Sequence, residues 1–522
     1  MITLKNFFRL LFAVVFSLLF ADTIVNAGAK IIYIPLDSRP VCFSYVKQSV
    51  AAAGYELLTP PEKMLATSKH KGKPDSLWRW FKEASSEADA AVVATDSLLY
   101  GGLVASRMHN ETEEKLFARV NNFAKLKEDY PGLKIYAFST IMRTPRQSYG
   151  NVEPPYYSVY GREIFALSQL YDKEQVQGLT LAEKNLKEEL LLSLPKKYLD
   201  DWFARRQKNY QVNELLADFA RNKTFHYLAL GKDDNAPLSQ THLESRHLME
   251  ATLDLAGSRF KILPGVDQLG LLLLTRTINE LNHEKPVVHV IYSEGEGKNT
   301  LPLYSDQRLS SSVPDQVLAL GGALTENPYN ADLILAVNTP FDGITKDSTA
   351  DDNLFFSSIH NKRFVKQINN FVGGGRNLAI ADVSYANGSD NGFMEELSRH
   401  VLLGQLAAYS GWNTADNTIG YALAQGVLSS KMKKADKDML LRARYLDDWL
   451  YQSNIRPVLV KLMKKYDSSL IYDFGSEQDD ILVATYEFYD YYLEKDSFLR
   501  LADFELSFPW NRLFEINVAF KK

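Results

Sequence analysis

The residues best suited to chemistry are two adjacent aspartates, Asp233 and Asp234, which follow an apolar run and stand beside Lys232 and Asn235. Neighbouring carboxylates disfavour each other's ionisation, so one of the two can keep a proton near neutral pH. Such a pair can supply a general acid and an orienting base. Asp, Asn and Pro are also common in turns and helix caps. We predict that Asp233 and Asp234 are the catalytic residues.

A second segment, residues 95–107 (TDSLLYGGLVASR), places Asp96 at the end of another apolar run. The glycine pair that follows allows the backbone to approach a ligand closely. Arg107 can bind an anionic group of the substrate or pair with Asp96. The segment lacks the Lys-Ser/Thr of a phosphate-binding P-loop. A tight turn with a structural ion pair is the alternative interpretation.

A third segment, residues 36–40 (LDSRP), has the same character. The proline restricts Arg39 to extended geometry, which can direct Arg39 and Asp37 towards a binding site. Asp37 can instead be a helix cap. The acidic residues 293–297 (SEGEG) are better interpreted as a solvated loop.

Amides, hydroxyls, carboxylates and Trp412 gather in residues 382–391 and 411–418. Sugars are bound by such groups, with hydrogen bonds to their hydroxyls and an aromatic ring under the sugar face. Turn and cap chemistry explains the Asn and Asp residues equally well. The predicted substrate-binding residues are Asp37, Arg39, Asp96, Tyr100, Arg107, Arg143, Lys232, Asn235, Asp382, Asn387, Trp412, Asn413 and Asn417.

Several chemistries lack their signatures in this chain. There is no G-x-S-x-G elbow and no H-E-x-x-H motif, and His242 and His247 do not share a helix face. The single cysteine, Cys42, cannot form an internal disulfide or a cysteine-based metal site, and we expect it to be buried. We predict no cofactor and no bound metal.

Eight short apolar runs alternate with helix-like segments. Near-continuous apolar runs are typical of parallel strands that are buried on both faces. The predicted strands are residues 31–36, 90–95, 134–138, 226–231, 260–263, 287–292, 332–337 and 377–381. Eight strands favour a (β/α)8 barrel, and an open doubly wound parallel sheet is the alternative. Residues 55–58 could add another strand. Both folds place ligands at the carboxyl ends of the strands.

The N-terminal residues 1–29 have the pattern of a signal peptide: Lys5 and Arg9, an apolar run, and small residues up to Ala29. The run of about 12 apolar residues is too short to span a bilayer. We therefore expect a secreted or periplasmic protein with no membrane span after cleavage. The formal charge of −5 disfavours nucleic acid as a partner.

Beyond the signal peptide, we predict two parts. Residues 30–390 form the barrel-like catalytic domain, with a loop and helical insertion at 146–222. Residues 391–522 form a mostly helical part that completes the site.

Five ordered motifs resemble the bacterial domain-of-unknown-function family numbered 4127 across the mature chain. They are LDSRP at 36–40, TDSLLYGGLVASR at 95–107, KDDNAP at 232–237, GWNTADNTIG at 411–420 and PWNRLFE at 509–515. This resemblance implies no activity. The adjacent aspartates are also similar to the pair that family 84 glycoside hydrolases use after a central barrel strand, an analogy at the level of the fold alone.

These features together favour an exported carbohydrate-active enzyme, a glycoside hydrolase that takes a glycan or other small-molecule substrate. A non-catalytic binder of cell-wall sugar or peptide is one alternative. A metal-dependent hydrolase with Asp37, Asp96 and Asp382 as ligands is another. The oligomeric state is left open.

Overall fold

The computed structural model describes residues 28–148, 151–255, 257, 259–401, 403–493, 497–500 and 503–520. Almost all of the predicted signal peptide, residues 1–29, lies outside them. The first strand, β1, begins at Lys30, immediately after the predicted cleavage region.

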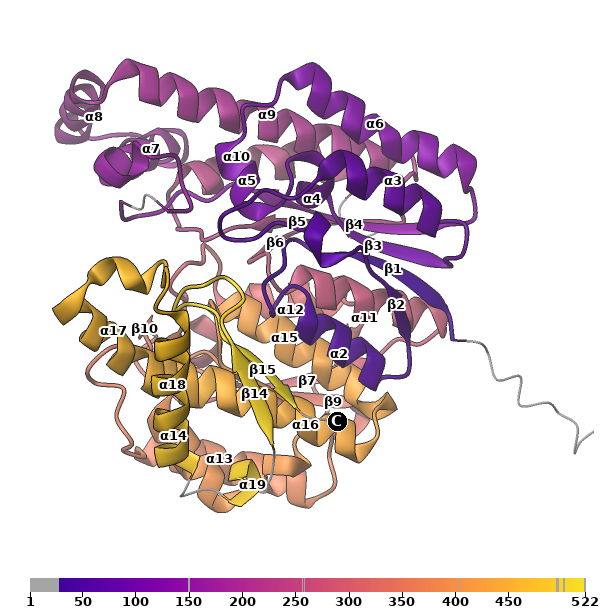
Figure 1. Cartoon of the computed structure of the whole chain (residues 1–522), viewed down its shortest axis with the longest axis vertical. Helices are drawn as coiled ribbons and strands as arrows, with labels where there is room; N and C mark the ends of the chain where they lie inside the picture. Colours follow the sequence, from indigo (N-terminus) through magenta and orange to yellow (C-terminus); the bar gives the residue numbers. More distant parts are fainter. Residues whose placement is uncertain are drawn as a thin grey trace, which may run out of the picture.

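The strands form two open parallel sheets, so the barrel favoured by the strand number is wrong and the doubly wound alternative fits (Figure 1). All eight predicted runs are strands, and residues 56–58 add another. Sheet A contains β1 (Lys30–Ile34), β2 (Glu56–Leu58), β3 (Ala90–Ala94), β4 (Lys134–Ile141), β5 (Tyr227–Lys232) and β6 (Phe260–Pro264). Sheet B contains β7 (Val287–Tyr292), β8 (Ala323–Leu324), β9 (Leu333–Asn338), β11 (Leu378–Asp382) and β13 (Ala408–Ser410).

Both sheets have the same winding. Sheet A has the order β2-β1-β3-β4-β5-β6, and sheet B has the order β8-β7-β9-β11-β13 when read from its other edge. In each sheet the second strand lies on one side of the first and the later strands lie on the other. The winding therefore reverses between β1 and β3 and again between β7 and β9. In open α/β sheets, ligands bind outside the carboxyl ends of the strands at such a reversal.

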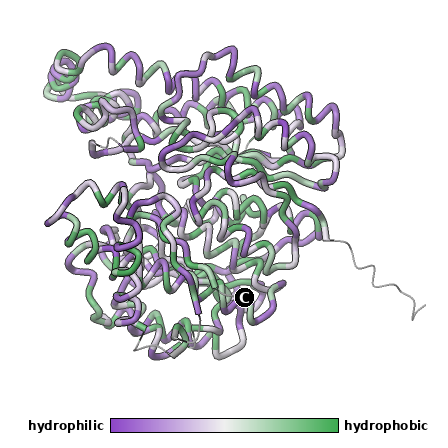
Figure 2. Tube along the Cα trace, in the orientation of Figure 1, coloured by the Kyte–Doolittle hydropathy of each residue, from purple (hydrophilic) through white to green (hydrophobic). Residues whose placement is uncertain are grey.

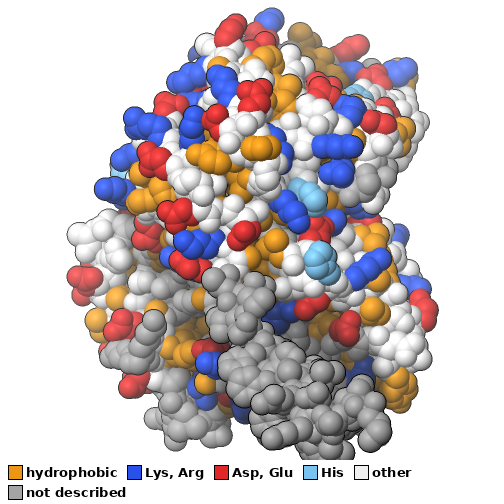
Figure 3. Space-filling model, turned by 90° about the vertical axis from the view of Figure 1, so that its right-hand side faces the viewer, with side chains coloured by type: hydrophobic (Ala, Val, Ile, Leu, Met, Phe, Trp, Pro, Cys, Tyr) orange, Lys and Arg blue, Asp and Glu red, His pale blue; other side chains and the backbone are white. Residues whose placement is uncertain are grey.

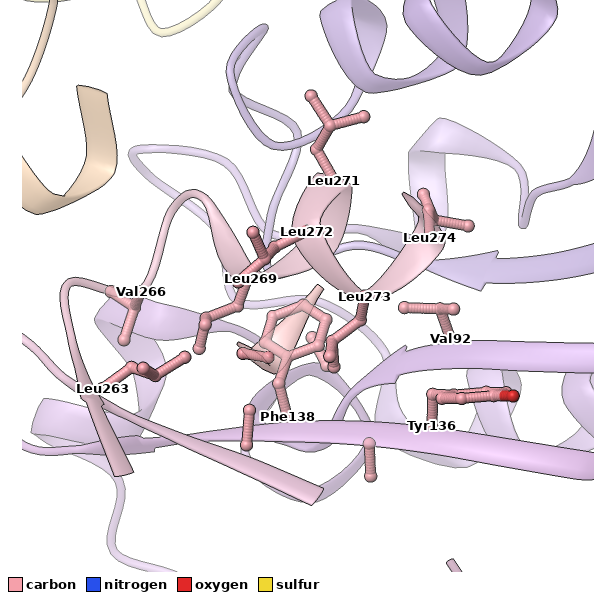
Figure 4. Packing of buried hydrophobic residues seen from close by; sticks show 14 of the residues in the cluster. Val92, Tyr136, Phe138, Leu263, Val266, Leu269, Leu271, Leu272, Leu273 and Leu274 are labelled. Atoms are coloured by element: carbon pink, nitrogen blue, oxygen red, sulfur yellow. The ribbon is translucent and has the colours of Figure 1, made fainter. Parts of the chain in front are cut away.

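A barrel did not form because the chain leaves sheet A after β6, which is an edge strand. Helix α11 (Leu269–Leu281) then leads to β7, the first strand of sheet B. In Figure 4, Leu269 and Leu273 point from α11 towards Phe138 of sheet A, whereas Leu271 points the other way. On its other side α11 packs against α15 (Ala415–Leu428), which covers sheet B.

The remaining helices surround the two sheets, and two of them, at Ser44–Ala52 and Leu309–Ala319, pack against α11 and α15 between the sheets (Figure 1). Over sheet A and in the 146–222 insertion they are α2 (Ser44–Ala52), α3 (Pro74–Ala84), α4 (Thr95–Leu99), α5 (Leu103–Met108), α6 (Glu113–Asp129), α7 (Tyr157–Val176), α8 (Leu181–Ser193), α9 (Lys196–Arg221) and α10 (Gln240–Ala251). Around sheet B they are α12 (Leu309–Ala319), α13 (Ile359–Gly373), α14 (Asn391–His400), α16 (Lys434–Arg444), α17 (Arg456–Tyr466), α18 (Gln478–Leu493) and α19 (Ser497–Arg500).

Smaller elements complete the structure. A π-helix, η7 (Tyr445–Ile455), joins α16 to α17, and its residues are buried. The strands β14 (Phe504–Ser507) and β15 (Asn517–Phe520) form an antiparallel ribbon, and β10 (Lys346–Asp347) pairs with β12 (Tyr385–Ala386).

Hydrophobic residues concentrate along the strands and the helices between the sheets (Figure 2). On the face shown in Figure 3, basic and acidic side chains are interspersed over the upper half, without a large area of one sign. None of the helices in the described ranges combines the length and apolar character needed to cross a membrane.

The packing of α11 predicts a large cost for truncating one of its leucines. Leu273 is fully buried, so Leu273→Ala should lower the free energy of unfolding by about 2–5 kcal/mol. Leu192→Ala is the matched control, because that side chain is 88% exposed and its loss should change stability by less than about 0.5 kcal/mol. Urea unfolding followed by circular dichroism measures the unfolding free energy of both variants. Equal losses in the two would contradict a core role for Leu273 of α11.

Candidate functional site

The polar residues predicted from the sequence lie mainly along the carboxyl edge of sheet A. Asp37 follows β1, Asp96 follows β3 at the start of α4, and Asp233 follows β5. Parallel strands present their carboxyl ends at one edge, so these side chains are gathered by the direction of the strands. Asp37 and Asp96 flank the point where the winding of sheet A reverses.

Arg39 is the centre of a buried ionic cluster. Its Nε lies 3.0 Å from both carboxylate oxygens of Asp37, and its Nη2 donates to Asp267 Oδ1 at 2.6 Å. Asn413, which follows β13 of sheet B, donates to the other oxygen of Asp267. The Oδ1 atom of Asn417 accepts the backbone N–H of Asp267 at 3.1 Å. The Asp267 carboxylate is therefore bound both by Arg39 of sheet A and by Asn413 of the segment that follows sheet B.

A second cluster holds the predicted catalytic pair. Asp233 Oδ2 accepts hydrogen bonds from Nε and Nη2 of Arg107. Arg107 is thus paired with Asp233, and Glu153 lies 3.5 Å from it. Arg143 bridges Glu153, at 2.6 Å, and Asp234, at 2.7 Å. Each of the two aspartates therefore has its own arginine.

The two aspartates differ in their surroundings. The Asp233 side chain is almost buried, whereas 30% of the Asp234 side chain is exposed. Desolvation by the surrounding protein and the charge of Asp233 raise the pKa of Asp234, against the opposing effects of Arg143 and Arg107. Asp234 also has a φ of +26°, which is unusual for a residue other than glycine. Strained backbone is common at functional sites.

Asp96 lies in a fully buried position. Its Oδ2 accepts hydrogen bonds from the backbone N–H of Thr140 at 3.1 Å and from the Thr140 hydroxyl at 3.0 Å. Burial raises the pKa of Asp96 to about 6. Its backbone carbonyl accepts the N–H groups of Tyr100, Gly101 and Gly102. Tyr100 is itself buried and packs against a histidine ring, so it is part of the core.

Lys232 and Asn235 are also held by buried partners. Lys232 pairs with Asp306 at 2.5 Å, and both side chains are buried. Burial raises the pKa of nearby Asp416 to about 6, against the opposing charge of Lys232. Asn235 Oδ1 accepts the Ser239 hydroxyl at 2.9 Å.

Three predicted residues belong to the surroundings of sheet B instead. Asp382 is the last residue of β11, and Asn387 donates to Asp347 at 2.9 Å. Trp412 is buried against Phe514 and presents no open ring face for a sugar. The backbone N–H of Asn387 donates to the Asn413 carbonyl at 2.8 Å. Since Asn413 also binds Asp267, residues 411–418 connect the residues around sheet B with the cluster around Arg39.

Four residues of this site were not predicted from the sequence: Asp267, Glu153, Asp306 and Trp510. Asp267 follows a predicted strand, the same signal that identified Asp37. The Trp510 ring centroid lies 5.4 Å from the central carbon of the Arg39 guanidinium, and the indole N–H donates to the Ser38 hydroxyl at 3.0 Å. Glu153 and Asp306 lie in loops, where only the fold reveals their partners.

The metal-dependent alternative lacks support in the geometry. Asp37 and Asp96 belong to sheet A, whereas Asp382 belongs to sheet B. Within the part of the chain that the structure describes, no three His, Cys, Asp or Glu side chains are grouped so that they could hold a metal ion. Cys42 is buried beside Arg39, and burial raises the pKa of its thiol well above the ordinary range.

The raised pKa of Asp96 predicts a pH-dependent stability. Between about pH 4 and 6 the folded protein keeps a proton that the unfolded chain releases. The free energy of unfolding should therefore fall as the pH rises through this window, by up to about 1.4 kcal/mol per pH unit. Asp96→Asn removes this contribution.

The measurement is the difference in unfolding free energy between the native protein and Asp96→Asn at several pH values. This difference should fall from pH 4 to 6 and then level off. For the control Asp254→Asn, the same difference should stay constant across the window, because Arg221 lowers the pKa of this exposed carboxylate. A difference that stays constant across the window would show that Asp96 is already ionised at pH 4.

One family model matches the chain over residues 31–519, nearly its whole length, and is described as "Protein of unknown function (DUF4127)". The curated proteins contain no significant match to the chain. The matched region covers both sheets and every motif on which the resemblance was based. The chain therefore belongs to the DUF4127 family.

Proposed function

We propose that the protein is a carbohydrate-active enzyme that hydrolyses a glycosidic bond at the carboxyl edge of sheet A. The observation that carries the proposal is the contrast between two adjacent carboxyl groups. Asp233 is buried and bound by Arg107, whereas Asp234 is partly exposed and has a raised pKa. Two titratable groups whose environments separate them in this way are suited to different acid–base roles.

In this mechanism Asp234 is the general acid. It donates its proton to the leaving oxygen as the glycosidic C–O bond breaks, and it later takes a proton from the water whose oxygen bonds to the anomeric carbon. The negative charge of Asp233 stabilises the positive charge that develops on the sugar ring. Arg107 holds the Asp233 carboxylate in place, and Arg143 holds Asp234.

The position of the pair also supports the proposal. Asp233 and Asp234 follow β5, an inner strand of sheet A, and lie at its carboxyl edge, the edge at which open α/β folds bind ligands. The analogy with family 84 glycoside hydrolases loses its basis in the fold, because their catalytic pair follows a barrel strand and sheet A is open. The proposal therefore rests on the two carboxyl groups and their partners alone.

The test is hydrolysis of a panel of p-nitrophenyl glycosides by the native protein and two variants. Asp234→Asn should lower kcat by about 10²–10⁴-fold, because the general acid is lost. Asp233→Asn should also lower kcat, since the developing charge is no longer stabilised. The loss in Asp234→Asn should be larger for the matching alkyl glycosides, whose leaving groups are poorer than p-nitrophenol and need the proton most.

Asp254→Asn is the matched control, since it removes an exposed carboxylate that pairs with Arg221 ahead of β6, whereas the aspartate pair follows the end of β5. It should retain native activity. Full activity in both Asp233→Asn and Asp234→Asn would refute the mechanism. Binding of a glycan without turnover by the native protein would favour the non-catalytic alternative.

We also propose that the protein is exported. The charged residues, apolar run and small residues of positions 1–29 support this. Mass spectrometry of the protein recovered from the periplasm or medium should find a mature N-terminus near Ala29. Val15→Asp, which interrupts the apolar run, should retain the uncleaved protein in the cell. Recovery of a full-length N-terminus outside the cytoplasm would contradict cleavage.

A further inference from the structure

Sheet B carries a cavity of about 430 Å³ at its own carboxyl edge. Its wall includes Ser293 after β7, Asn338 at the end of β9, and Asp390 at the start of α14. β7 and β9 are the neighbouring strands between which the winding of sheet B reverses. The cavity therefore occupies the position where an open α/β sheet is expected to bind a ligand.

The floor of the cavity is polar and firmly held. Asn338 donates to Asp382 Oδ1 at 2.9 Å and lies 3.5 Å from Asp390 Oδ2. The backbone N–H of Asp390 and the Tyr409 hydroxyl donate to the other oxygen of Asp382, at 2.9 and 3.1 Å. Burial and the charge of Asp390 raise the pKa of Asp382 to about 7. Asp382 is fully buried and outside the wall, whereas the Asn338 amide and the Asp390 carboxyl group line the cavity and offer hydrogen-bonding groups to a ligand.

The rim of the cavity is apolar and open to solvent. Phe341 is 54% exposed and stacks on His360 with 3.9 Å between ring centroids, and Phe356 is 76% exposed. Ile344 and Leu354, also in the wall, are 61% and 62% exposed. Aromatic rings over a polar floor suit a ligand that has both apolar faces and hydroxyl groups.

The acidic loop at residues 293–297 holds this rim in place. Gly295 has a φ of +92°, and a Cβ atom there would lie 2.1 Å from the Phe341 carbonyl oxygen. The same oxygen accepts the backbone N–H of Glu296 at 3.0 Å. Residues 294–296 are exposed, in agreement with the predicted solvated loop, and the loop also fixes the backbone of Phe341. Glycine is required at 295 because a side chain would occupy the space of that backbone.

The charges of the wall favour an uncharged ligand. Glu294 is paired with His360 at 2.9 Å and with Arg363 at 3.2 Å, and Asp352 is paired with Lys346. Asp390 accepts the N–H groups of Gly392 and Phe393 as the cap of α14. Asp342, also in the wall, accepts the backbone N–H of Ile344 at 3.0 Å. Each of these carboxylates therefore has an ionic or hydrogen-bond partner, which lessens the need for a cationic ligand.

From this geometry we propose that the cavity at the carboxyl edge of sheet B is a second binding site, which takes the ring of a neutral saccharide. The ring lies against Phe341 and Phe356, and its hydroxyls bond to Asp390, Asn338 and Tyr385. This site is separate from the Asp233–Asp234 pair, which belongs to sheet A. The proposal holds whether or not the protein hydrolyses glycosides.

Saturation-transfer NMR with methyl glycosides of glucose, galactose, mannose and N-acetylglucosamine tests the proposal, with 2-phenylethylamine as a cationic probe. At least one sugar should bind the native protein. Phe356→Ala and Asp390→Asn should each weaken that binding by about tenfold or more. Asn serves as a helix cap as well as Asp does, so Asp390→Asn should still fold.

Phe355→Ala is the matched control, because Phe355 is 46% exposed on the same loop and is not part of the wall. It should bind sugar as the native protein does. Asp234→Asn should lose hydrolysis and keep this binding, so failure of either proposal can be distinguished. Binding of no sugar, binding of 2-phenylethylamine alone, or equal binding by Phe355→Ala and Phe356→Ala would each overturn the proposal.

Discussion

The buried cluster of Arg39, Asp37 and Asp267, which Asn413 joins from beyond sheet B, is the interaction on which the site depends. Arg39 binds the carboxylates of Asp37 and Asp267 within sheet A, and Asn413 from beyond sheet B binds Asp267 as well. All four side chains are buried. A buried charge that loses its partner is strongly destabilising, so these groups must stay together. The position of residues 411–418 against sheet A follows from this requirement.

The need of buried polar groups for partners also explains the position of the C-terminal segment. Trp510 covers the Arg39 guanidinium and bonds to Ser38, which brings the last described residues back to the first strand. Buried Asp448 in the π-helix accepts the N–H of Gly411 at 2.8 Å and pairs with Arg444 at 2.9 Å. The C-terminal part is therefore a support for the segment that joins the two sheets, although it contributes little to either sheet.

Because the two sheets have the same winding, each has a reversal at its carboxyl edge, the position where open α/β sheets bind ligands. At the carboxyl edge of sheet A, buried charges are paired with one another, Asp37 with Arg39 and Asp233 with Arg107. At the carboxyl edge of sheet B there is a cavity with an aromatic rim and with Asn338 and Asp390 in its wall. The first arrangement is suited to proton transfer, and the second is suited to holding a ring. The chemical difference comes from the loops, because the sheets themselves are alike.

The sequence by itself determined the strands, because a strand buried on both faces must be apolar along its whole length, and it determined that polar residues such as Asp37, Asp96 and Asp233 follow them. It also revealed the family through short ordered motifs. Only the tertiary structure decided that the strands form two sheets, since strand pairing depends on where α11 carries the chain after β6. The tertiary structure alone also decided that Arg107 pairs with Asp233 and Arg39 with Asp267, since these partners are 126 and 228 residues apart in the sequence. Local sequence specifies which side chains end a strand, whereas the burial of each charge beside a partner is settled by the whole fold.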